Sequence, residues 1–134
     1  MRRPVAIILL LMLAGCNLTP AQPTSTPAPD RPGVRFLAPE DGATVFAGTD
    51  LTLDVYGWDE TEGAGVAEIQ VLVNGALLRS AVVQDALALP EFRVEMNWVA
   101  EGVGPVRIVA VAYRGDGTFS EEAALTVQVL PPEN

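Results

Sequence analysis

Residues 68–78 read Glu-Ile-Gln-Val-Leu-Val-Asn-Gly-Ala-Leu-Leu, and they predict the architecture of the chain. Every second residue from Ile69 to Val73 is isoleucine or valine, a period of two that is typical of a strand with one buried face. Asn74-Gly75 follows at once, and a second apolar run comes after it. This pair suits a two-residue hairpin because both central residues of that turn need a positive φ. The segment therefore predicts two antiparallel strands joined by a tight turn.

The same pattern recurs on both sides of this hairpin. Apolar runs with little helical periodicity alternate with Gly-, Pro- and Asp-rich turns, at 39–42, 59–65, 102–105 and 114–117. Further strands are therefore expected at 34–38, 51–56, 92–98, 106–113 and 125–129. About seven short strands in 131 − 33 + 1 = 99 residues predict an all-β, two-sheet Greek-key β-sandwich.

The period of two also predicts which side chains point into the sandwich. A core of this size needs no disulfide. The inward residues are expected to be Leu51, Leu53, Val55, Ile69, Val71, Val73, Phe92, Val94, Met96, Trp98, Ile108, Ala110, Ala112, Leu125, Val127 and Val129.

Several of these segments resemble bacterial immunoglobulin-like domains. The similarity lies in residues 39–45 (Pro-Glu-Asp-Gly-Ala-Thr-Val), residues 65–75, the strand that ends at Trp98, and residues 110–113 (Ala-Val-Ala-Tyr). It implies an immunoglobulin-like or fibronectin III-like sandwich, used in exported proteins as a spacer, adhesion or recognition module. The family shares no catalytic residues, so none are carried over. Arg114 stands where many relatives have Asp, which weakens any inherited cation site.

The N-terminus has the three parts of a secretory signal: a basic start, an apolar run at residues 5–13, and small residues before Cys16. The run is shorter than the roughly 20 residues of a membrane-spanning helix. Residues 13–16 (Leu-Ala-Gly-Cys) resemble the lipobox of bacterial lipoproteins. This implies cleavage between Gly15 and Cys16 and acylation of Cys16 with chains such as palmitate, two or more of which anchor a protein stably. The alternative is an ordinary signal peptide with an incidental cysteine.

A tether is expected between the lipid and the domain. Five of the 16 residues from 17 to 32 are Pro, with Thr, Ser and Ala between them. Such a segment stays disordered and extended, at about 3.1 Å per residue. The expected divisions are 1–15 signal peptide, 16–32 lipidated Cys and tether, 33–131 β-sandwich, and 132–134 tail. A bare spacer is expected in preference to an O-glycosylated one.

Composition excludes several function classes. The chain has no His and one Cys, which removes internal disulfides, most metal ligand sets and the Ser/His and Cys/His nucleophile pairs. We expect no enzyme activity, cofactor or resident metal. The eight Arg residues face 17 acidic ones, for a net charge of −9; losing residues 1–15 would make it 6 − 17 = −11. Such a charge repels the phosphate backbone, so no nucleic-acid partner is expected.

Two features could contact a ligand at one end of the sandwich. Tyr56 and Trp58 share one face of their strand and would stack on a sugar or a peptide if exposed, or would pack against the domain. The acidic loop from Asp59 to Glu62 could offer oxygen ligands to Ca²⁺, alone or together with Asp116. The spacing does not match an EF-hand, so a solvated loop is the expected state.

A third feature is an apolar stripe on an outer sheet face. Val109, Val111 and Tyr113 point away from the predicted core, on a strand expected to neighbour the one that carries Leu72. Exposed apolar patches often mark partner surfaces. The alternative is that the connection at 81–90, with Val82, Val83, Leu87 and Leu89, covers the stripe.

The expected protein is therefore monomeric, held by lipid at a membrane, and exposed to the periplasm or cell exterior. Its immunoglobulin-like domain would bind or scaffold without catalysis, with an envelope protein or a glycan as partner. The alternatives are a carbohydrate-binding module at the cell surface and an accessory subunit of an envelope complex.

Overall fold

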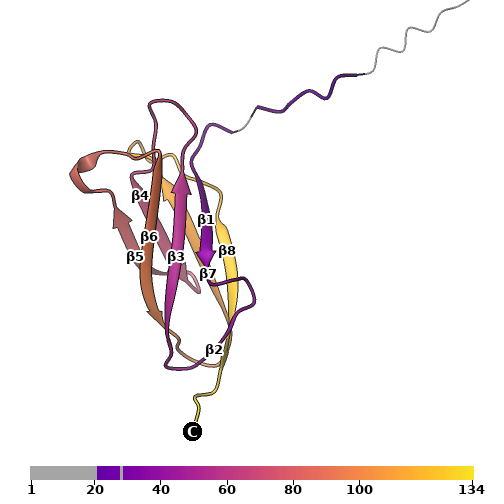
Figure 1. Cartoon of the computed structure of the whole chain (residues 1–134), viewed down its shortest axis with the longest axis vertical. Coiled ribbons are helices and arrows are strands. Elements are labelled where there is room, and N and C mark those ends of the chain that lie inside the picture. Colours follow the sequence, from indigo (N-terminus) through magenta and orange to yellow (C-terminus); the bar gives the residue numbers. More distant parts are fainter. Residues whose placement is uncertain (1–20, 28) are drawn as a thin grey trace, which may run out of the picture.

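The computed structural model describes residues 21–27 and 29–134, and it folds into a two-layer β-sandwich (Figure 1). Within these residues there are eight strands and one short 3₁₀ turn, η1 (Gln84–Ala86). The strands are β1 (Gly33–Ala38), β2 (Thr44–Phe46), β3 (Asp50–Trp58), β4 (Glu68–Val73), β5 (Ala76–Val82), β6 (Glu91–Val99), β7 (Gly104–Tyr113) and β8 (Ala123–Leu130).

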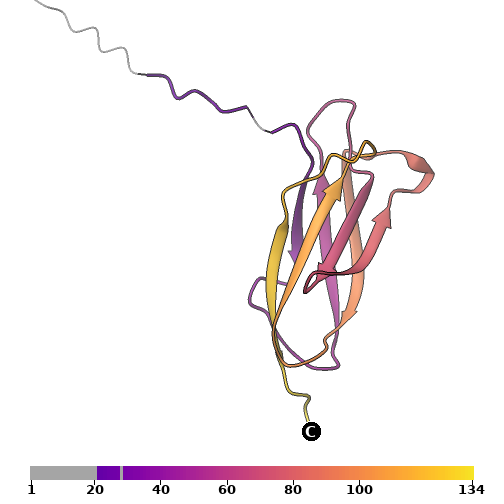
Figure 2. The same cartoon turned by 180° about the vertical axis from the view of Figure 1, so that it is seen from behind.

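The two layers are a three-stranded and a five-stranded sheet. Their strand orders are β1-β3-β6 and β2-β8-β7-β4-β5. All neighbours are antiparallel except β2 and β8, which are parallel. The chain changes layer in five connections, β1–β2, β2–β3, β3–β4, β5–β6 and β6–β7, so each sheet combines strands from distant parts of the sequence (Figures 1 and 2). The predicted all-β sandwich is confirmed.

The β4–β5 hairpin forms as its sequence predicts. Asn74 and Gly75 have φ values of 46° and 83°, the left-handed region that this turn requires. Asn74 also fixes the neighbouring strand: its N–H donates to the carbonyl of Arg107 at 2.8 Å, and its side-chain oxygen accepts from the Arg107 N–H at 3.0 Å. β5 runs on to Val82, beyond the predicted 76–78.

All sixteen residues predicted to face inward belong to the core. Twelve are buried, and Leu51, Val73, Phe92 and Val94 are partly buried against them. Val66, Ala100 and Val106 complete the buried cluster without having been predicted. Val66 and Ala100 lie outside the named strands, in connections that fold back over the ends of the sandwich, where a period of two carries no signal.

The structure differs from the prediction in two further respects. β2 was not predicted, because three residues are too few to show a period; it pairs with β8 through Val45 and Val129. β7 begins at Gly104, inside a predicted loop. Pro105 is tolerated there because its nitrogen faces the same side as the Arg107 carbonyl, toward β4, and β4 ends before reaching it.

The tether and the C-terminus lie at opposite ends of the sandwich (Figure 1). The tether joins β1 at the end that carries the β3–β4 and β7–β8 connections. There Pro32 is buried, and the side chain of Arg31 forms an ion pair with Glu121 at 2.6 Å. We call this the tether end of the domain, and the other the far end.

Candidate functional site

The residues on which membrane anchoring depends lie outside the described part of the chain. These are Cys16, the cleavage position Gly15 and the preceding apolar run. In the part that is described, no helix is long and apolar enough to cross a membrane.

The predicted aromatic pair lies on the outer face of the β1-β3-β6 sheet. Tyr56 and Trp58 are stacked, with ring centroids 5.8 Å apart and planes inclined by 21°. The guanidinium of Arg35, from β1, lies 5.1 Å from the Tyr56 centroid and 5.8 Å from that of Trp58. Both rings are half-buried. They are therefore partly engaged in a cation–π cluster within the domain, which fixes their orientation.

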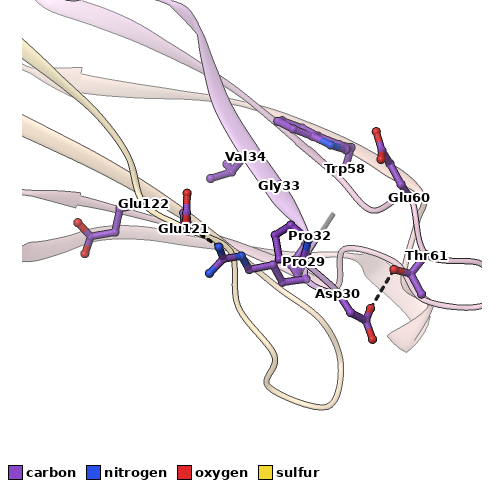
Figure 3. Close-up of a pocket in the computed structure, with 11 residues that line it drawn as sticks. Pro29, Asp30, Pro32, Gly33, Val34, Trp58, Glu60, Thr61, Glu121 and Glu122 are labelled. Carbon is purple, nitrogen blue, oxygen red and sulfur yellow. Dashed lines mark hydrogen bonds and ion pairs between the residues drawn. The ribbon is translucent and has the colours of Figure 1, made fainter. Parts of the chain in front are cut away.

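Gly33 determines where the Trp58 ring can lie. The two residues are register partners on β1 and β3, and the indole lies against Gly33 (Figure 3). A Cβ added at Gly33 would be 2.4 Å from two atoms of that ring. The absence of a side chain at residue 33 thus creates the seat for the indole.

Open hollows lie on both sides of Trp58. One, of about 620 Å³, is bounded by the end of the tether at Pro29 and Pro32 (Figure 3). The other, of about 600 Å³, is bounded by Arg35, Tyr56 and Glu91. Trp58 and Glu60 line both. An indole that lines two hollows of mixed polar and apolar character is an arrangement that suits a ligand with both polar and apolar faces.

Charged groups extend this face along the sheet. The nearby carboxylate of Glu91 raises the pKa of the Tyr56 phenol, because it can accept the hydroxyl proton in a hydrogen bond and its negative charge disfavours the phenolate. Arg93 binds Asp54 through two bonds of 2.9 and 2.6 Å and holds the pKa of that carboxyl below its usual value. The sheet face therefore offers aromatic rings flanked by oriented donors and acceptors.

Arg114 binds the first residue of the acidic loop, Asp59, while Glu60 and Glu62 are exposed to solvent as expected. The guanidinium donates to both carboxylate oxygens of Asp59, at 2.6 and 3.0 Å, and to Asp30 of the tether at 2.8 Å. Thr61 links the two acids, since its hydroxyl donates to Asp30 and its N–H to Asp59. The Asp59 carboxylate is fully buried and the Arg114 side chain is 11% exposed. We call Asp30, Asp59, Thr61 and Arg114 the tether clasp.

The tether clasp bears on the question of a cation site. Arg114 lowers the pKa of both Asp59 and Asp30 through its hydrogen bonds, so both carboxylates are held ionised. Asp116 accepts from the N–H of Thr118 instead of joining Asp59. Among residues 21–27 and 29–134, no three potential ligands are grouped as a metal site requires. Arg114 supplies within the chain the positive charge that these acids need.

The predicted apolar stripe forms on the outer face of the five-stranded sheet. Leu72 and Val109 are register partners on β4 and β7, and Val111 and Tyr113 continue the row. Val109 and Val111 are only 9% and 7% exposed, whereas Phe119, beside Tyr113, is 62% exposed. The two valines are shielded by their neighbours on the sheet, and the accessible part of the stripe lies at its margins.

The connection at 81–90 lies at the tether end. Leu89 pairs with Val66, and the Val83 N–H donates to the carbonyl of Ala67, so the segment is held at the edge of the sandwich. Val83 is buried, whereas Val82, Leu87 and Leu89 are exposed. The alternative in which this connection covers the stripe is therefore not supported by their burial.

Sequence reasoning missed two features of the candidate site. The seat at Gly33 depends on the register between two strands far apart in the chain. The tether clasp joins Asp30, Asp59 and Arg114, which are also far apart. The one sequence signal for the tether clasp is Arg114, which follows the Ala-Tyr pair at a position where many of the related domains have Asp.

Comparison with solved structures identifies the fold. A fibronectin(III)-like module structure of Clostridium thermocellum CbhA aligns with a TM-score of 0.56 at 19% identity, covering 75% of this chain and 99% of that one. The CARDB domain of a Pyrococcus furiosus protein, solved with di-metal ions, aligns with a TM-score of 0.59 at 20% identity, covering 79% and 99%. The domain is immunoglobulin-like.

A solution structure of the same Pyrococcus domain agrees, with a TM-score of 0.58 at 18% identity over 75% of this chain and 94% of that one. No protein-family model matches the sequence, and no curated protein matches it. At these identities the likeness establishes the architecture of the immunoglobulin-like domain. Its function must be argued from its own surface.

Proposed function

We propose that this protein is a lipid-anchored component of the cell envelope that presents a non-catalytic immunoglobulin-like domain for binding. The observation that carries the proposal is Cys16, placed directly after an apolar run and two small residues. A Pro-rich tether separates this residue from a domain with the immunoglobulin-like fold.

The manner in which the tether meets the domain supports this role. Asp30, Arg31 and Pro32 contact the tether end, so the described structure continues from β1 into the segment that leads to Cys16. A lipid at Cys16 would then place the tether end toward the membrane and the far end away from it (Figure 1). The membrane is the first partner of the protein in this proposal.

The test is metabolic labelling with a fatty acid in a lipoprotein-processing bacterium. Cys16→Ala should abolish acyl labelling and leave the protein uncleaved or released from membranes, because no other thiol is present. Asn17→Ala is the control and should be labelled like the unchanged protein. Labelling that persists in Cys16→Ala would refute the anchor.

A second candidate function is glycan binding at the aromatic face. It is favoured by the position of Trp58 between two open hollows and by the polar groups of Arg35, Glu60 and Glu91 around it. Sugars present apolar ring faces and polar hydroxyls, which match an indole bordered by charged side chains.

Affinity electrophoresis in gels that contain cell-wall or plant polysaccharide tests this candidate. Retardation should be lost in Trp58→Ala and kept in Phe119→Ala, which removes an exposed aromatic ring from the β7–β8 connection. Equal migration with and without every polysaccharide would exclude glycan binding at this face.

A further inference from the structure

The five-stranded sheet ends in an unpaired edge at β5. In the described residues, β5 pairs with β4 only. The Val83 N–H donates toward β4, to the carbonyl of Ala67. Peptide groups alternate in direction along a strand, so the N–H and C=O groups of Val82 and Ser80 face away from β4. These groups form a row of unused donors and acceptors along one side of the domain.

A mainly apolar groove, whose lining also includes Asn97 and Glu101, runs beside the far half of this edge. It lies between the start of β5 and the end of β6 and has a volume of about 340 Å³. Trp98, which is almost buried, contributes to its lining, together with Leu78. Leu77 and Val99 also line it and are 58% and 49% exposed. Side chains of a strand added to β5 would therefore meet an apolar surface as well as backbone partners.

The other edges of the two sheets are less suited to accept a strand. β2 has only three residues, and β1 has six. β1 and β5 each contain one register shift, and β5 pairs regularly from Arg79 to Val82. β6 carries Glu91, Arg93 and Glu95 on its outward face. β5 carries one charge, Arg79, in seven residues. Charged side chains are a common protection against edge pairing; β6 carries three of them, whereas β5 carries one over a longer strand than β1 or β2.

We propose that β5 is a docking edge for an extended segment of a partner protein, which adds to the sheet as a sixth strand. The inference goes beyond the anchored binding role by naming the surface and the class of partner. The partner segment has apolar side chains at alternate positions, to fill the groove. It also carries a carboxylate opposite Arg79, which has no ion-pair partner among the described residues.

Charge favours a different protein over a second copy of this chain. Pairing of two β5 edges around Ser80 would bring the two Arg79 side chains close together. It would also join two chains that each have a net charge of −9. A segment with an acidic residue opposite Arg79 avoids the repulsion between the two Arg79 side chains. A partner whose net charge is positive, or less negative than −9, reduces the repulsion between the two chains.

The groove lies where a partner could reach it. Ala76–Leu78 follow the hairpin turn, and β6 ends beside them, on the half of the domain away from the tether (Figures 1 and 2). A protein anchored through its N-terminus would keep this half clear of the lipid surface.

The experiment uses a library of random twelve-residue linear peptides, selected on the full chain in detergent. The peptides recovered should alternate apolar residues and contain Asp or Glu. Ser80→Pro removes one outward N–H while leaving the β4 ladder intact. It should weaken binding of a selected peptide at least tenfold, while Ser80→Ala, which loses only the hydroxyl bond to Glu68, stays within twofold.

Further arms make the result decisive. Arg79→Glu should weaken acidic peptides and favour their Lys-substituted versions. If Ser80→Pro does not fold, Val82→Pro replaces it, because its N–H also faces outward. The proposal would be overturned if no peptide is recovered or if the proline variant binds a selected peptide as well as the unchanged protein. It would also be overturned if hydrogen exchange shows that the peptide protects amides away from β5, or if the chain self-associates through β5. Loss of the lipid anchor would leave all these results unchanged, so the two proposals fail separately.

Discussion

At the scale of single residues, the structure of the tether end depends on Gly33 and Arg114. Gly33 has no side chain where Trp58 needs space, and Arg114 places a guanidinium where two carboxylates converge. Both act across strands that are distant in sequence, and each gives a measurable consequence.

Gly33→Ala should displace the indole of Trp58. The added Cβ would lie 2.4 Å from two ring atoms, so the ring or the strand must move. Overpacking of this kind costs about 1–3 kcal/mol, and we expect a lower urea midpoint and altered tryptophan fluorescence. Gly115→Ala is the control, since nothing lies within 4 Å of its Cβ. Unchanged fluorescence in Gly33→Ala would show that the position of the Trp58 ring does not depend on a glycine at residue 33.

Arg114→Met should destabilise the domain through Asp59. The substitution keeps the length of the side chain but leaves a buried carboxylate without its cation. We expect a Tm decrease several times larger than in Arg107→Met. That control variant removes the 3.5 Å ion pair between Arg107 and Glu122, in which both side chains are exposed. Thermal unfolding followed by circular dichroism measures both. Equal Tm values in the two variants would mean that the tether clasp contributes no stability.

Acid should weaken the domain in a defined direction. Arg114 lowers the pKa of Asp59 and Asp30, and Arg93 lowers that of Asp54. The native state therefore binds fewer protons than the unfolded state near pH 4. The stability from these pairs is complete above the unfolded pKa of about 3.9 and is lost as pH falls through the lower native values. Urea midpoints between pH 2.5 and 6 should show this loss, and Arg114→Met should lose less.

At the scale of the elements, the sequence predicts what is periodic or local. Seven strands, the Asn74-Gly75 turn and sixteen core residues follow from alternation and turn chemistry. β2 was missed because three residues show no period, and the register that pairs Gly33 with Trp58 depends on contacts across the sheet. The apolar stripe lies on the predicted outer face of its sheet. The low exposure of Val109 and Val111 depends on neighbouring side chains that the period of two does not identify.

Leu53→Ala tests the core of β3. Leu53 is fully buried among both sheets, so its truncation leaves a cavity and should cost about 2–5 kcal/mol of unfolding free energy. Leu87→Ala changes the same side chain at a position that is 67% exposed, and we expect a change within about 0.5 kcal/mol. Urea denaturation compares them. A small effect at Leu53 would contradict the described core.

At the scale of the whole molecule, the proposed anchor gives the domain an orientation. Residues 16–29 lie before the tether clasp, and a Pro-rich segment of this length would span about 40 Å at about 3.1 Å per residue. The tether end should therefore stay closer to the lipid than the far end. The binding edge at β5 would be accessible to a partner approaching from outside.

Energy transfer to labelled lipid measures this orientation. In the proposed lipoprotein Cys16 is acylated, so a thiol at Glu62→Cys or Glu101→Cys can be labelled alone. Glu62 lies in the β3–β4 connection at the tether end, and Glu101 lies in the β6–β7 connection at the far end. Transfer should be greater from residue 62. Equal transfer from the two sites would show that the domain tumbles freely about its tether.

The opposite placement of the tether and the β5 groove has a mechanical consequence. A partner held at the far end and a lipid held at the membrane would pull the domain along its long axis. β1 enters from the tether and runs antiparallel to β3, so such a pull loads its ladder of hydrogen bonds in shear, all at once. Arg114 and Glu121 hold Asp30 and Arg31 ahead of that ladder and take the load first. A domain anchored and bound in the proposed way would thereby be suited to transmit tension between the membrane and its partner.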